Sequence, residues 1–153
     1  MVLELDRKKR ILNTYEAMCN IIGINFRDFG FVAPVVFLLS EEYGIQFYNV
    51  YEAWDNGLAM EDIIYAVRNL IKKLDACAVI FVQEVRLVEE GVERRQAVAR
   101  VEFYEDDGRV SGVETVFELD TEHREVKSVS RAEVNDFMFL KVSERAASNG
   151  GLN

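Results

Sequence analysis

Three acidic residues and one lysine have the types and spacing of a metal-dependent hydrolase. Glu125 and Lys127 form a Glu-x-Lys pair, and Asp106 or Asp107 lies upstream as a second carboxylate. In such a site, two carboxylates hold a divalent metal and the lysine orients the attacking water. A Glu-x-Lys pair is also common by chance when 29% of residues are charged, and the two aspartates precede Gly108 in a stretch typical of a turn. A metal-dependent hydrolase or nuclease is therefore an alternative hypothesis and not the leading one.

The tripeptide Asp28-Phe29-Gly30 has the sequence that holds magnesium beside ATP in protein kinases. A kinase also needs a glycine-rich loop, a strand lysine and a His-Arg-Asp catalytic loop before this tripeptide. Only 27 residues precede Asp28, and none of them is histidine. We therefore expect a turn at Gly30, where glycine leaves φ free, and no kinase activity.

The one histidine and the two cysteines form no catalytic or zinc-binding pattern. His123 lies in a polar stretch beside Glu122 and Glu125, without a serine, cysteine or aspartate at triad spacing. Cys19 and Cys77 each lie among apolar residues, which predicts small buried side chains. Because a zinc site needs three or four ligands, we expect no structural zinc, and we expect no cofactor.

Charge and hydropathy limit the classes of partner. The net charge is −9, and the only cluster of basic residues is Arg7-Lys8-Lys9-Arg10. Since nucleic-acid binding needs a basic face, we expect no nucleic-acid partner. The longest apolar run, residues 31–39, contains Pro34 and is too short to span a bilayer, so we expect no membrane partner either. These features predict a soluble, acidic, cytoplasmic protein.

The elements that must position these side chains follow from hydrophobic periodicity. Apolar residues recur at helical spacing over 5–22, where Gly23 is a stop signal, and over 60–74. Residues 131–144 have a capping-box start and predict a last helix, although "DFMFLKV" also has the pattern of a strand. The predicted strands cover 33–40, 45–51, 76–88, 96–104, 110–119 and 125–129.

The order of these elements predicts an α+β fold. Short hairpin connections favour a mainly antiparallel sheet of five or six strands, in the order α-ββ-α-βββ(β)-α. Because most strands alternate in polarity, we expect the helices to pack on one face of the sheet. One domain over residues 1–145 is predicted, followed by a disordered tail of small and polar residues over 146–153.

Four charged residues on two adjacent strands are candidates for a polar site. Glu84 and Arg86 share a face of one strand, and Arg100 and Glu102 share a face of the next. In a hairpin they form a cross-strand ladder whose register the sequence does not fix. The functional hypothesis is an acid–base or anion site, and the alternative is a solvated face of weak ion pairs.

Aromatic residues concentrate in the segment 26–54, which holds more than half of those in the chain. In the predicted strand 45–51, Phe47 and Tyr51 point to one face and Tyr48 to the other. One face enters the core, and the other leaves aromatic area at the surface unless the N-terminal helix covers it. We expect Tyr48, Tyr51 and Trp54 to contribute to a binding surface.

The leading hypothesis is a non-catalytic interaction module whose partner is a second copy, as a homodimer, or another protein. The first alternative is the metal-dependent hydrolase described above. The second is a small-molecule binding module with its site between the sheet and its helices.

Overall fold

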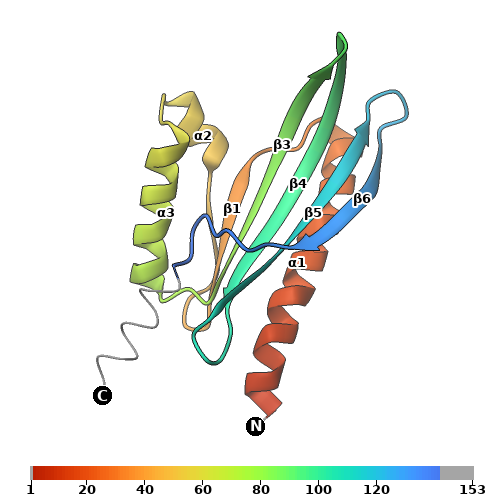
Figure 1. Cartoon of the computed structure of the whole chain (residues 1–153). Helices are drawn as coiled ribbons and strands as arrows, with labels where there is room; N and C mark the ends of the chain where they lie inside the picture. The colour runs from red at the N-terminus through yellow and green to blue at the C-terminus, as the bar shows by residue number, and fades with distance from the viewer. Residues whose placement is uncertain (1, 142–153) are drawn as a thin grey trace.

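The computed structural model describes residues 2–141, with side chains from residue 7, and has the α+β fold that the sequence predicts. Figure 1 shows three helices and one long twisted sheet. The elements are α1 (Val2–Phe29), β1 (Val35–Ser40), β2 (Gly44–Tyr48), α2 (Val50–Asp55), α3 (Met60–Leu74), β3 (Ala78–Glu89), β4 (Val92–Tyr104), β5 (Val110–Asp120) and β6 (Glu125–Glu133). The tail predicted at 146–153 lies outside the described residues.

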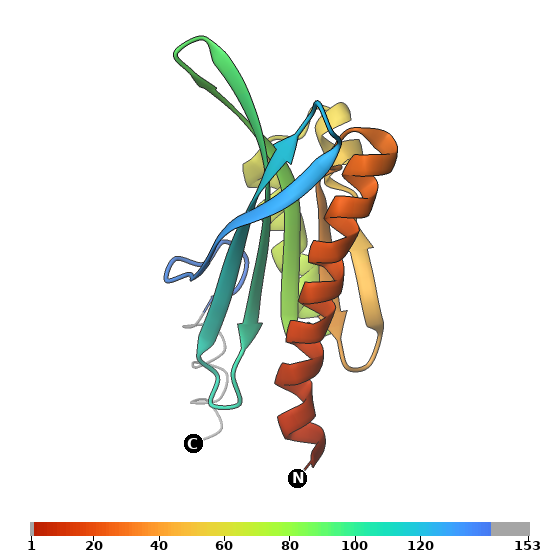
Figure 2. The ribbon, with the colours of Figure 1, turned by 90° about the vertical axis from the view of Figure 1, so that its right-hand side faces the viewer.

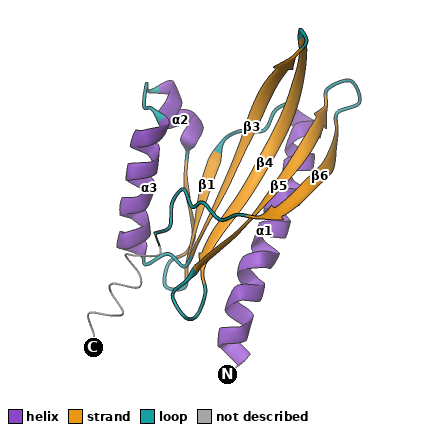
Figure 3. Cartoon of the chain, in the orientation of Figure 1, coloured by secondary structure: helices purple, strands orange, loops and turns teal. Residues whose placement is uncertain are grey.

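The six strands form one antiparallel sheet in the order β2-β1-β3-β4-β5-β6 (Figure 3). Hairpins join β1 to β2 and link β3 through β6 in succession, as the short turns predict. The α2–α3 segment connects β2 to β3, and it places β3 beside β1 and leaves β2 as an outer strand. The sheet therefore has two open edges, β2 and β6.

Helices cover both faces of the sheet, so the prediction of helices on one face is wrong. Successive residues of β3 divide between two cores: Ile80 and Val82 pack with α1, whereas Val79 and Phe81 pack with α3. Figures 1 and 2 show α1 on one side of the sheet and α3 on the other. The continuous apolar run "ACAVIFV" at residues 76–82 is typical of a strand that is buried on both faces, and this signal is more informative than the alternation in β4 and β5.

Helix α1 is longer than the sequence predicts and ends at Gly30. Gly23 lies inside the helix, so it is not the stop signal that the sequence predicts. A Cβ added at Gly23 would contact nothing within 4 Å, so no close contact requires a glycine there. Gly30 has φ 79° and donates its N–H to the Phe26 carbonyl at 2.8 Å, which confirms the turn expected at Asp28-Phe29-Gly30. The kinase-like tripeptide is thus the end of a helix.

Helix α3 has the predicted bounds, 60–74, and its apolar stripe faces the sheet. Ile63, Val67 and Ile71 are buried at helical spacing. The Asp62 carboxylate accepts a hydrogen bond from the Ala59 N–H at 3.0 Å, which satisfies a donor at the helix start. The helix therefore forms where periodicity and capping agree.

The predicted C-terminal helix 131–144 is absent from the residues described there. Residues 131–133 belong to β6, residues 134–141 have no regular structure, and residues 142–144 lie outside the described residues. Instead of helical bonds, the N–H groups of Met138, Phe139 and Leu140 donate to the fully buried carboxylate of Glu102, at 2.8, 2.9 and 3.0 Å. One side chain thus supplies the acceptors that a helix would have supplied.

The Glu102 carboxylate is balanced by the neighbouring Arg100, whose Nε donates to it at 2.8 Å. Arg100 also donates to Glu114 at 3.2 Å and to the Asp136 carbonyl. Phe139 and Leu140 are buried beside α3, so this ionic cluster fixes a second apolar layer against the sheet.

We predict that Glu102→Gln lowers the free energy of unfolding by at least about 3 kcal/mol, because it removes the fully buried one of the carboxylates that pair with Arg100. Urea denaturation followed by circular dichroism measures the loss. The control is Glu114→Gln, whose carboxylate is 35% exposed and contacts the same arginine. This control variant is expected to lose at most about 1 kcal/mol. Equal small losses in both variants would contradict the role given to Glu102.

Candidate functional site

The residues of the hydrolase hypothesis lie at opposite ends of β5. Asp106 and Asp107 are in the turn that precedes β5, whereas Glu125 pairs with Asp120 at its far end. β5 has 11 residues, and at about 3.4 Å per residue the two groups are separated by roughly 35 Å. Within residues 2–141, no group of three or more His, Cys, Asp or Glu side chains is placed to hold a metal ion. The geometry therefore does not assemble the predicted metal site.

The predicted charge ladder is wrong, because its two halves lie on opposite faces of the sheet. Glu84 lies opposite Ala97 and Arg86 lies opposite Arg95 on the α1 face. Arg100 and Glu102 lie on the α3 face, where they hold the C-terminal segment. A shift of pairing by one residue changes the face of every side chain, and only the structure fixes this register.

Glu84 has a structural role at the end of α1. Its carboxylate accepts two hydrogen bonds from Arg95, each at 2.8 Å, and one from the Val32 N–H at 3.1 Å. Arg95 also donates to the Gly30 carbonyl at 2.9 Å. Although burial acts to raise the pKa of the Glu84 carboxyl, the bonds from Arg95 and Val32 hold that pKa below its usual range. The pair ties the α1–β1 loop to the β3–β4 hairpin.

We predict that Glu84→Gln destabilises the protein by about 1.5–3 kcal/mol at pH 7, the value of a hydrogen bond to a charged group. Because the folded-state pKa is depressed, this stabilisation is complete above the ordinary carboxyl pKa of about 4.3 and is lost as the pH falls through the folded pKa. The two proteins should therefore begin to converge in unfolding free energy as the pH falls below about 4.3. Denaturant melts between pH 3 and 7 test this, and a constant difference across that range would contradict it.

The cysteines and the histidine lie in settings that do not favour nucleophilic catalysis. Cys19 and Cys77 are buried and free, as predicted, and burial raises the pKa of both thiols, so neither favours the reactive thiolate. His123 is exposed and bonds Asp120 at 2.8 Å, and this hydrogen bond raises the pKa of its imidazole. Among the described residues, no serine or cysteine hydrogen-bonds the His123 ring.

The α1 side of the β1–β2 hairpin is an open apolar surface, which we call the open hairpin face: Phe37, Leu39, Ile45 and Phe47. Phe47 lies opposite Phe37 and Ile45 lies opposite Leu39, so all four point to the same side of the sheet as α1. The outer pair is exposed, with Ile45 at 53% and Phe47 at 69%. Helix α1 packs against β3, β4 and β5 and also contacts β6, and neither Ile45 nor Phe47 belongs to the core that it forms. The alternative that the N-terminal helix covers the strand is therefore wrong for β2.

The aromatic residues named from the sequence occupy other positions than expected. β2 ends at Tyr48, because the Asn49 side chain caps a new helix by accepting the Glu52 N–H at 3.0 Å. Tyr48 is partly buried against the α3-side core. Tyr51 and Trp54 belong to α2, where they are 59% and 39% exposed. The exposed aromatic residue of the edge strand is consequently Phe47 and not Tyr48.

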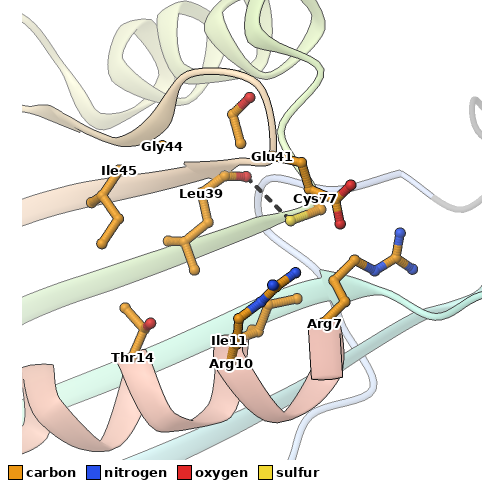
Figure 4. A pocket seen from close by; sticks show the side chains of 10 residues that line it. Arg7, Arg10, Ile11, Thr14, Leu39, Glu41, Gly44, Ile45 and Cys77 are labelled. Carbon is orange, nitrogen blue, oxygen red and sulfur yellow. Dashed lines mark hydrogen bonds between the residues drawn. The ribbon is translucent and has the colours of Figure 1, made fainter. Parts of the chain in front are cut away.

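A pocket of about 650 Å³ lies at one end of the open hairpin face (Figure 4). One wall is α1, which contributes Arg7, Arg10, Ile11 and Thr14. The other wall is the β1–β2 hairpin, which contributes Leu39, Ser40, Glu41, Gly44 and Ile45, together with Cys77 just before β3. Sequence reasoning missed this site, because its two walls are some 30 residues apart in the chain and Arg10 has the pattern of a solvated first turn.

Comparisons with known proteins add no family to this description. No protein-family model, no curated protein and no solved structure matches the chain. None of the helices in the described part of the chain has both the length and the apolar character needed to cross a membrane. The functional argument therefore depends on the surfaces and pockets of this structure.

Proposed function

We propose that this protein is a non-catalytic interaction module that self-associates through its edge strand β2. The observation that carries the proposal is the exposed apolar pair Ile45 and Phe47 on a strand at the edge of the sheet. β2 has no charged residue, and its outer backbone groups have no strand beside them. An unprotected edge of this kind is a template for pairing with another strand.

The strand at the opposite edge of the sheet, β6, differs from β2 in its charge. β6 has charged side chains along its length, and charges on an edge strand discourage pairing with other chains. These residues are Glu125, Lys127, Arg131 and Glu133. The two edge strands of the sheet therefore differ in charge, and the uncharged strand β2 is the one suited to pairing with a partner strand.

A second copy of the chain fits the geometry of β2. The strand covers residues 44–48, so a two-fold axis at Gln46 would place Ile45 of one copy opposite Phe47 of the second copy. Both pairs would lie on the α1 side and would join the two open hairpin faces into one apolar surface. Aromatic and β-branched pairs of this type stabilise antiparallel strands.

The other functional hypotheses receive less support from the geometry. The hydrolase residues are far apart, and the thiols and the imidazole lack catalytic partners among the described residues. A net charge of −9 does not favour nucleic acid as the partner. A cytoplasmic protein that binds a copy of itself or another protein remains our proposal.

We predict that size-exclusion chromatography with light scattering at micromolar concentration gives about twice 17.6 kDa. Phe47→Glu should give the monomer mass, because it places a charge in the centre of the pairing strand. The matched control is Val129→Glu, which adds the same charge at an exposed position of β6, and it should remain dimeric. A monomeric wild-type protein at high concentration, or dissociation by Val129→Glu alone, would overturn the proposal.

A further inference from the structure

The pocket beside the open hairpin face has one unpaired charge of each sign. Arg10 on α1 and Glu41 on the hairpin both line it, and neither forms an ion pair or a side-chain hydrogen bond with the described residues. Arg7 is also present, but it already pairs with Asp106 at 2.8 Å and reaches the Tyr104 carbonyl at 3.4 Å. The charges left for a ligand are therefore one guanidinium and one carboxylate.

Figure 4 shows Arg10 on the helix wall and Glu41 on the opposite wall, with Cys77 at the start of β3 between them. The electrostatics of Cys77 support this arrangement. Burial is the main cause that raises the pKa of its thiol, while Arg7 and Arg10 act to lower that pKa and Glu41 acts to raise it. All three charged groups are thus near the same buried sulfur.

The rest of the pocket is mainly apolar. Ile11 and Leu39 form a buried floor, and the exposed Ile45 lies beside them. The Thr14 hydroxyl also lines the space and has no hydrogen bond with the described residues. A pocket of about 650 Å³ that combines apolar side chains with polar and charged groups can hold a small molecule.

We propose that this pocket binds a zwitterion with an apolar body, namely an α-amino acid with a large apolar side chain. The ligand carboxylate bonds to the Arg10 guanidinium, whose paired N–H donors match two carboxylate oxygens. The ligand ammonium bonds to the Glu41 carboxylate. The ligand side chain packs on the buried Ile11 and Leu39 and covers Ile45, which would otherwise contact water. The site shares Ile45 with the β2 pairing of the proposed function, but its two charged groups, Arg10 and Glu41, lie outside β2, and Phe47 does not line the pocket.

The test is a calorimetric titration of the full chain with L-phenylalanine and two analogues that each lack one charge. 3-Phenylpropanoate lacks the ammonium group and phenethylamine lacks the carboxylate. L-Phenylalanine should bind saturably, and each analogue should bind at least about tenfold more weakly, since each loses one charge-assisted hydrogen bond. A titration of the Phe47→Glu variant keeps this test independent of self-association and should give the same affinity.

Two variants, each with a control variant at the neighbouring residue, test whether Arg10 and Glu41 bind the ligand. Arg10→Gln and Glu41→Gln should each weaken L-phenylalanine binding at least about tenfold. Lys9→Gln and Glu42→Gln remove neighbouring exposed charges that do not line the pocket, and they should leave the affinity unchanged. Absence of binding up to about 10 mM, or equal affinity in all four variants, would overturn the proposal. Equal binding of 3-phenylpropanoate, with no effect of Glu41→Gln, would overturn the assignment of a zwitterion.

Discussion

A single helix cannot cover one face of a six-stranded sheet, and this constraint determines where the molecule is open. At about 4.8 Å between strands, the sheet is roughly 24 Å wide, whereas a helix with its side chains is about 10–12 Å across. Within residues 2–141, α1 is the one helix on its face, and its buried stripe packs mainly over β3, β4 and β5 and contacts β6. The hairpin β1–β2 at the other side therefore keeps exposed apolar residues next to the helix. The open hairpin face and the pocket beside it both result from this incomplete cover.

The opposite face is closed by more elements. α2, α3 and the segment 137–140 cover it together, and its core includes Val36, Phe81, Tyr104 and Leu140. The last of these segments has no regular structure, so its N–H groups need acceptors inside the protein. Glu102 supplies them, and Arg100 offsets the cost of its buried charge. The apolar area that is left exposed beside α1, at Ile45 and Phe47, therefore favours the α1 side as the binding side.

The sequence predicts those parts of the fold in which local signals agree. Helix α3 is predicted residue for residue, because its apolar stripe, its acidic first turn and its basic last turn are all local. The β1–β2, β3–β4 and β4–β5 hairpins are predicted for the same reason, since their turns contain or adjoin a glycine. The cap of α2 at Asn49 is also a local signal, but the aromatic strand-like pattern of 45–51 obscures it. β-propensity depends on the tertiary setting, so this pattern was misread as one strand.

The parts that depend on long-range contacts could not be predicted. Glu102 has the pattern of a solvated strand residue, and it is buried because residues 138–140 return to it across the sheet. The partner of Glu84 depends on the β3–β4 register, which the alternation of charges leaves open. The pocket joins α1 to the β1–β2 hairpin, so neither wall shows it alone. In each case the missing information is which distant segment covers a given face.

Hydrogen–deuterium exchange tests the central claim, that the uncovered hairpin is an interface between copies. The backbone amides of residues 44–48 should exchange quickly at low protein concentration and become protected at a roughly hundredfold higher concentration, because pairing with a second β2 strand gives the outer amides acceptors. The amides of β6 should show no such dependence. Identical exchange of residues 44–48 at both concentrations, or concentration-dependent protection of β6 instead, would contradict the account.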